Sequence, residues 1–359
     1  MHTKHTSKAL ALLLTIAIAL TAAVSAFAAA PESALAKALD YLDGKKASLV
    51  FGSTSDQSDW KAFALARGGK AIPETYLVSA ADAVKAEELG QSTDYARAVL
   101  VLTAMGYNAG NFAGCNLLEP LTDINFVKEN LPNGPSFALL ALNSHSAYAG
   151  KIPGGYDLEL VDVLLGEYTA LGWSAGAVSG VDIDATAMAL QALAPYYGID
   201  KVKAKVDAAL LLLAGEQFAT GGFGPDWGEW GHFEDSCSTA QVVTALSALG
   251  LDAAGYFSKD ALKALLGFQE ANGGFDAALG ENPFADAQAT HALEAYTRYK
   301  ENAKGLFDMR DTALSVYGEK TGNWLDKLPD WLGAIRNWEP WIQAVVYYVF
   351  FGWIWDVIR

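Results

Sequence analysis

Residues 182–193 (DIDATAMALQAL) and 235–250 (DSCSTAQVVTALSALG) share one pattern, in which a short polar residue opens a run rich in alanine and leucine. Segments of the same character occupy residues 59–69, 94–106, 136–144 and 286–296. An equivalent anchor leucine recurs in the six segments, at Leu65, Leu102, Leu142, Leu193, Leu246 and Leu293. Self-similarity at intervals of roughly 40 to 50 residues is typical of a repeat architecture.

Segments of a second kind alternate with these six: residues 32–42, 74–89, 123–130, 157–171, 202–213 and 259–270. They are more charged, and their apolar residues fall on one stripe of a helix, whereas the first six are apolar nearly all round and should be buried on every side. No alternating strand pattern competes with them. We therefore predict an all-α fold, an α/α toroid in which about six inner helices are wrapped by about six outer ones. An open solenoid is the alternative.

In such a toroid the inner helices run in one direction, so their N-termini gather at one mouth of the ring. The polar residues that open them are suited to cap the helices, because their oxygens accept bonds from free N–H groups. A concavity where six helix ends meet is also the expected place for a ligand. We expect the ligand-binding residues to be Asp94, Asp182, Asp184, Trp227, Trp230, Asp235 and Asp286.

The first 28 residues have the form of a secretory signal peptide. Lys4 and Lys8 supply a positive start, residues 9–24 are an uncharged run that is apolar except for two threonines, and residues 26–28 (AFA) form a small-x-small cleavage site. An uncleaved N-terminal anchor is the alternative. We expect a secreted protein on the extracellular side of the cell envelope, with a repeat domain at residues 29–311 and a tail at residues 312–359.

The composition excludes some functions. The chain carries a net charge of −16. Nucleic acids and anionic bilayers are negatively charged and are bound through Lys and Arg side chains, so we do not expect this chain to bind them by charge. Hydrophobic residues make up 52% of the chain and charged residues 18%, which indicates a globular core rather than disorder. Cys115 and Cys237 permit one disulfide but do not require it.

Tryptophan dominates the tail. Six of the ten tryptophans lie between Trp324 and Trp355, and Pro329 and Pro340 divide this region into short helices. The final apolar segment is suited to a membrane interface, and we expect the anchoring residues to be Trp338, Trp341, Phe350, Phe351, Trp353 and Trp355. Packing of the tail onto the repeat domain, or docking to a partner, are the alternatives.

A second motif, Q-x-x-x-G-G-F, ends two of the outer segments, at residues 217–223 and 269–275. Together with the D-x-x-x-T-A or D-x-x-T-A helix starts that follow, it resembles the prenyltransferase and squalene-cyclase repeat over about residues 34–311. We expect Gly222 and Gly274 to adopt the left-handed conformation that ends a helix, and Phe223 and Phe275 to pack against the neighbouring unit.

The resemblance implies different activities in different branches of that superfamily. Squalene cyclases use a D-x-D-D motif as their acid, which would make Asp184, with Asp182, catalytic in a terpenoid-cyclase-like enzyme, although Ala185 replaces the last Asp. Protein prenyltransferases bind zinc through Asp, Cys and His ligands, for which Asp235, Cys237 and His291 are the counterparts. His291 lies about one turn out of register for that site.

Two non-catalytic branches remain. Transcobalamin-like proteins bind a corrinoid between the helical domain and a small β-rich domain, which this chain does not show after Asp311. Secreted bacterial surface proteins with the repeat resemble this chain best. We therefore expect an envelope-associated protein that binds a small ligand or an envelope protein at the mouth of the ring, without catalysis and with no cofactor. A terpenoid-cyclase-like enzyme is the alternative, and cobalamin and zinc are the alternative cofactors.

Overall fold

The computed structural model describes residues 30–176, 178–277 and 282–318. The predicted signal peptide at residues 1–28 and the anchoring residues from Trp338 to Trp355 lie outside them. The prediction of a mainly helical chain is confirmed. The α-helices of the described residues are α2 (Ala30–Lys45), α3 (Ser58–Arg67), α4 (Glu74–Lys85), α5 (Ser92–Ala104), α6 (Ile124–Lys128), α7 (Asn133–Leu142), α8 (Tyr156–Gly166), α9 (Ile183–Leu193), α10 (Asp200–Glu216), α11 (Ser236–Ala248), α12 (Ala261–Leu266) and α13 (Ala285–Lys300).

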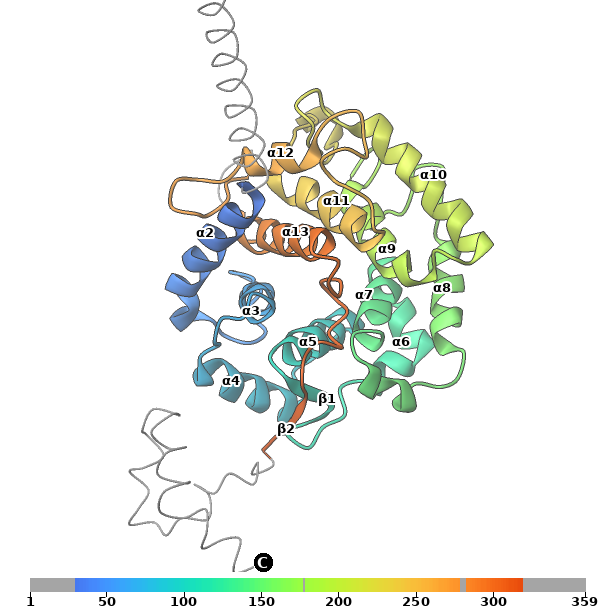
Figure 1. Cartoon of the computed structure of the whole chain (residues 1–359). Helices are drawn as coiled ribbons and strands as arrows, with labels where there is room; N and C mark the ends of the chain where they lie inside the picture. Colours follow the sequence, from blue (N-terminus) through green and yellow to red (C-terminus); the bar gives the residue numbers. More distant parts are fainter. Residues whose placement is uncertain (1–29, 177, 278–281, 319–359) are drawn as a thin grey trace, which may run out of the picture.

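The odd-numbered helices from α3 to α13 coincide with the six alanine-rich segments, and they lie around the centre of the molecule with the even-numbered helices outside them (Figure 1). Their anchor leucines are buried, with Leu142 2% exposed and the other five fully covered. The short 3₁₀ helices are η1 (Lys46–Ser48), η2 (Pro120–Thr122), η3 (Ser146–Lys151), η4 (Ala194–Tyr196) and η5 (Gly228–Trp230).

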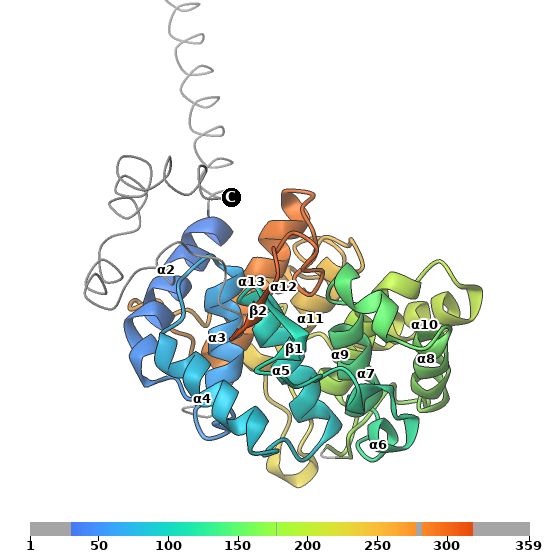
Figure 2. The ribbon, with the colours of Figure 1, turned by 90° about the horizontal axis from the view of Figure 1, so that it is seen from below.

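The odd-numbered helices form a closed series of contacts. Each packs against the next, from α3 through α5, α7, α9 and α11 to α13, and α13 packs in turn against α3. The first helix of the described residues, α2, lies against both α13 and α3, so the two ends of the described helical region meet. Figure 2 shows the same helices from the side, with α5, α7, α9 and α11 next to one another.

The two Q-x-x-x-G-G-F turns make the same contacts in both copies. The Gln217 side-chain amide donates to the carbonyl oxygens of Gly221 and Lys259, at 2.9 Å each. The Gln269 amide donates to Gly273 O at 3.2 Å and to Ala34 O at 2.8 Å. Each glutamine therefore links its own turn to the outer helix that follows or to the residues just before it. In the second copy that helix is α2, so this bond connects the C-terminal part of the helical region with its N-terminal part.

The glycine assignment within these turns was wrong by one residue. The positive φ belongs to Gly221 (+110°) and Gly273 (+97°), not to Gly222 and Gly274. A Cβ at Gly221 would lie 2.6 Å from the Asp260 carbonyl oxygen, so this glycine also permits close backbone approach. The second glycines leave room for side chains instead, such as Tyr41 beside Gly274.

The phenylalanines that follow are buried, as predicted, with Phe223 fully covered and Phe275 7% exposed. The Phe223 N–H donates to Thr239 Oγ1 at 2.9 Å, which links the turn to the first residues of α11. Trp173 occupies the same kind of position before α9, where its N–H donates to Thr186 Oγ1 at 3.2 Å. The threonine of the D-x-x-x-T-A start therefore holds the preceding turn in place.

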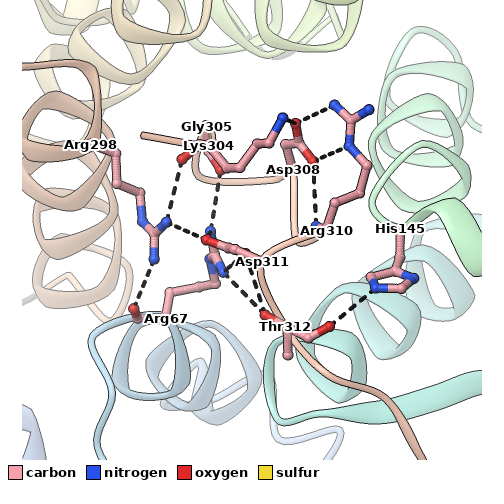
Figure 3. A network of polar contacts seen from close by, with 9 residues as sticks. All are labelled: Arg67, His145, Arg298, Lys304, Gly305, Asp308, Arg310, Asp311 and Thr312. Atoms are coloured by element: carbon pink, nitrogen blue, oxygen red, sulfur yellow. Dashed lines mark hydrogen bonds and ion pairs between the residues drawn. The ribbon is translucent and has the colours of Figure 1, made fainter. Parts of the chain in front are cut away.

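The segment after α13, residues 302–312, crosses the centre of the molecule and is called here the closing segment. Leu306 and Met309 are buried, and the Met309 N–H donates to Ser144 O at 2.7 Å. Asp311 forms ion pairs with Arg67 at 3.0 Å and with Arg298 at 2.9 Å (Figure 3). These contacts fasten the closing segment to α3 and α13.

A short parallel pair of strands follows, formed by β1 (Tyr107–Phe112) and β2 (Ser315–Tyr317). No strand was predicted here, since the six residues of β1 do not alternate between polar and apolar. The pair is stabilised by aromatic contact between Phe112 and Tyr317, whose ring centroids lie 4.7 Å apart. The packed structure therefore continues beyond Asp311, where the repeat domain was expected to end.

Candidate ligand-binding cavity

A cavity of about 460 Å³ lies where the first turns of the six central helices meet. Each of these helices contributes a side chain from its first turn: Trp60, Thr93, Asn133, Asp184, Cys237 and Gln288. The cavity is called here the central cavity. Its position agrees with the expectation that the helix starts converge on one concavity.

The lining residues follow the helical period. On α9 they are Asp184, Met188 and Gln191, and on α11 they include Gln241 and Thr244, which lie four and seven residues after Cys237. Residues at this spacing share one face of a helix. These helices were predicted to carry small or apolar residues nearly all round. The isolated glutamines within alanine-rich helices were the signal that one face of each helix borders a polar cavity.

Amide and aromatic side chains make up much of the lining. The amides are Gln57, Asn130, Asn133, Gln191, Gln241, Asn282 and Gln288, and the aromatic rings are Trp60, Phe137, Phe284 and Phe307. Gln191 Nε2 donates to Gln241 Oε1 at 2.8 Å, and this bond links α9 to the neighbouring helix α11. The rings of Trp60 and Phe137 lie 5.7 Å apart and are inclined by 36°.

The cation in the lining, Arg97, is neutralised by the protein itself. Its Nε donates to Asp59 Oδ2 at 2.8 Å and its Nη2 to Asp94 Oδ1 at 2.9 Å. Asp59 is buried and also accepts a bond from the Tyr76 hydroxyl at 2.6 Å. Asp94, one of the expected ligand-binding residues, therefore orients Arg97, and with Gln91 it forms the capping box of α5.

Asp184 supplies the carboxylate among the lining residues of the central cavity, and it has no ionic partner in the described structure. Its Oδ1 is shielded from solvent and accepts no hydrogen bond. Burial, and then the charges of Asp235 and Asp182, raise its pKa to about 7. This carboxyl therefore changes charge near neutral pH at the wall of the central cavity.

Three of the expected ligand-binding acids accept hydrogen bonds from backbone N–H groups instead. Asp182 caps α9, accepting from Ala185 N at 3.0 Å. Asp235 caps α11, accepting from Ser238 N at 2.7 Å, and burial raises its pKa. Asp286 accepts from Phe275 N at 2.9 Å. None of the three lines the central cavity.

A smaller cavity of about 200 Å³ adjoins the central one and shares Asp184 and Met188 with it. Trp227, which is 41% exposed, lies at its edge together with Asp182. Trp230 ends η5 in the same loop. Of the expected ligand-binding residues, the structure thus brings Asp182, Asp184 and Trp227 together around this smaller cavity.

The proposed zinc ligands do not form a site. Among the described residues, no group of three or more His, Cys, Asp or Glu side chains is placed to hold a metal ion. His291 instead donates from Nε2 to Trp60 O at 2.9 Å, and its burial lowers the pKa to about 4, so the ring is neutral at pH 7. Cys237 and Cys115 are both free thiols.

Neither a protein-family model nor a curated protein matches this sequence. The resemblance to the prenyltransferase and squalene-cyclase repeat therefore depends on the residues described above. Within residues 30–318, apart from the gaps given earlier, no helix is long and apolar enough to cross a membrane.

Proposed function

We propose that the chain is an α/α toroid of the prenyltransferase and squalene-cyclase repeat type, with the odd-numbered helices from α3 to α13 as its inner ring. Three observations support this assignment. The contacts of these helices close on themselves, their first turns line one cavity, and the two Q-x-x-x-G-G-F turns make equivalent bonds. An open solenoid would leave α2 and α13 apart, whereas here they pack together.

The proposed function is non-catalytic binding of a small ligand in the central cavity. The observation that carries it is the set of shielded oxygens without hydrogen-bond partners in the lining: Asp184 Oδ1, Asn133 Oδ1 and Gln288 Oε1. A buried polar atom without a partner costs about 1–3 kcal/mol, so a ligand that donates to these oxygens would recover that free energy. The residues that carry these oxygens come from α9, α7 and α13, and all three line the cavity.

The remaining ionisable side chains of the lining favour binding over catalysis. Arg97 is held by two carboxylates, and burial raises the pKa of the Cys237 thiol, which makes it a poor nucleophile. His291 is neutral and bonded to Trp60 O, so it is not placed as a general base for Cys237.

A terpenoid-cyclase-like activity is the second candidate, and Asp184 favours it. Its raised pKa keeps part of the carboxyl protonated at neutral pH, as a general acid requires. Incubation of the purified protein with polyprenyl substrates tests this candidate. Turnover that the Asp184→Asn variant abolishes would replace the binding function with catalysis. A corrinoid-binding protein is the further alternative, and the next experiment detects a corrinoid directly.

Native mass spectrometry of the full chain, purified from its own host, tests ligand binding. We expect a retained small molecule on the wild-type protein and its loss from a Gln288→Trp variant, because the larger ring fills the central cavity. A Tyr256→Trp variant, at an exposed position away from the lining, is the matched control and should retain the molecule. A bare wild-type protein, or equal retention by both variants, would contradict the proposal.

We also propose that the protein is exported and that the tryptophan-rich tail associates it with the envelope, through lipid or an envelope protein. Cell fractionation of a chain ending at Gly318 tests this. That end point keeps the closing segment and β2, which an end at Asp311 would cut. The shortened protein should move from the membrane fraction to the supernatant while staying folded. If it remains with membranes, the tail is not the anchor.

A further inference from the structure

We infer that the ligand of the central cavity is a neutral saccharide, an inference that rests on the proposed binding function. The inference follows from the hydrogen-bonding groups, the charge balance and the ring surfaces of the lining.

The amides of the lining match hydroxyl groups. A side-chain amide offers two N–H donors and one carbonyl acceptor, and a hydroxyl both donates and accepts. A ring of hydroxyls on a sugar can therefore satisfy several amides at once. Gln191 and Gln241 already bond each other, whereas Asn133 and Gln288, which also line the cavity, each carry a shielded carbonyl oxygen without a hydrogen-bond partner. Together with Asp184 Oδ1, these unpaired oxygens favour a ligand with several O–H or N–H donors.

The charge balance disfavours an ionic ligand. An anion would meet the Asp184 carboxyl, while the cation of the lining, Arg97, already has carboxylates on both sides at 2.8 and 2.9 Å. Among the described lining residues, Asp184 is the one carboxylate that could pair with a cationic ligand. Burial keeps that carboxyl partly protonated at neutral pH, so it would balance the charge of a cation only in part. A neutral ligand avoids both costs of burying unmatched charge.

The aromatic rings supply the other half of sugar recognition. The C–H faces of a pyranose ring are weakly positive and apolar, and they pack on the negative face of an aromatic ring. Trp60, Phe137 and Phe284 are only partly buried and line the cavity, so ring surface is open to it. The volume of about 460 Å³ lies in the lower part of the range for small-molecule sites, roughly 300–1,000 Å³. The cavity therefore suits a small oligosaccharide rather than a polymer chain.

Isothermal titration of the full chain tests the inference with four probe classes. These are a panel of neutral mono- to tetrasaccharides, glucose 6-phosphate, spermine and farnesol. We expect binding from the neutral saccharides and none from the other three. Asn133→Leu and Trp60→Ala should each weaken that binding at least about tenfold, as expected when a hydrogen bond or a stacking surface is lost.

Matched variants separate the site from general destabilisation. Asn125→Leu, at an exposed position of α6, and Tyr256→Ala, at an exposed ring, should leave saccharide affinity within about twofold of wild type. Gln288→Met, which removes an amide at similar size, should repeat the loss if Trp60→Ala fails to fold.

The outcomes distinguish this inference from the proposed function. Binding of spermine, glucose 6-phosphate or farnesol that depends on Trp60 and Asn133 would overturn the saccharide inference and leave ligand binding in the central cavity intact. Saccharide binding unaffected by the cavity variants would place the ligand elsewhere and overturn both. Absence of binding across the neutral panel at millimolar concentration would overturn the saccharide inference, and native mass spectrometry would still decide the proposed function.

Discussion

The ring of Phe307 is stacked on that of Phe63, with centroids 5.4 Å apart and planes inclined by 20°. Phe63 is fully buried in α3, whereas Phe307 belongs to the closing segment. Phe307 also lines both the central cavity and a larger cavity of about 840 Å³, which reaches the C-terminal turns of α7, α9 and α11. The closing segment therefore separates two cavities and forms one wall of the proposed ligand site.

Replacing Phe307 with alanine should destabilise the protein by about 2–4 kcal/mol, because it removes the stacked ring and enlarges the cavities on both sides. Urea unfolding measures the change. Phe233→Ala, at a ring 36% exposed in the loop before α11, is the control and should cost under about 1 kcal/mol. A loss below about 0.5 kcal/mol for Phe307→Ala would show that the closing segment contributes little to the core.

Replacing Asp311 with asparagine should destabilise the protein by about 1–3 kcal/mol, because the buried Arg67 guanidinium loses its anionic partner. Burial alone would raise the pKa of Asp311, but the hydrogen bonds and charges of Arg67 and Arg298 hold it below its ordinary value. The wild-type protein binds fewer protons here when folded, so it should lose stability as pH falls below about 4. Asp311→Asn should lack that part of the pH dependence in acid-unfolding curves, and an unchanged curve would contradict the assignment.

The helical segments could be predicted because a buried helix consists mainly of small and apolar residues, which can be read from the sequence. Residues 182–193 and 235–250 carry no charged side chain after their first three residues and consist mainly of small or apolar residues, and the structure places α9 and α11 within two residues of these limits. The cavity could be predicted only as a location. Which face of each helix borders it depends on the rotation of the helix, and a single glutamine such as Gln191 does not specify that rotation.

The closing segment and the strands could not be predicted, because local sequence does not encode them. Residues 302–312 have no helical or strand period, and their place depends on ion pairs between residues far apart, such as Arg67 and Asp311. The roles of the acids were also ambiguous. Asp182 and Asp184 stand two residues apart, yet one caps α9 and the other presents an unpaired oxygen at the cavity wall.

Replacing Leu193 or Leu246 with alanine should each destabilise the protein by about 2–5 kcal/mol. Both side chains are fully buried on central helices, where neighbouring helices on each side limit collapse of the cavity left behind. Thermal or urea unfolding of the two variants tests this. Leu211→Ala, at a leucine 77% exposed on α10, is the matched control and should change stability by no more than about 0.5 kcal/mol.

Replacing Asp184 with asparagine should stabilise the folded protein above pH 7 by about 1–3 kcal/mol. If Asp184 were instead a helix-capping residue, the same replacement would destabilise the protein. Burial and the charges of Asp235 and Asp182 raise the Asp184 pKa to about 7, so between about pH 4 and pH 7 the folded state holds a proton that the unfolded state has released. Wild-type stability should therefore fall as pH rises through this window, and the asparagine variant should lack this fall.

Urea unfolding at intervals between pH 4 and pH 8 measures this difference between wild type and Asp184→Asn. Asp260→Asn is the control, because Asp260 caps α12, its charge is not one of those that act on Asp184, and an asparagine can still accept the Lys263 N–H, so it should change stability little and keep the wild-type slope. Parallel curves for wild type and Asp184→Asn would mean that the carboxyl is already ionised in the fold. The unpaired Asp184 oxygen would then be a permanent negative charge in the cavity wall, which favours a cationic ligand over a neutral one.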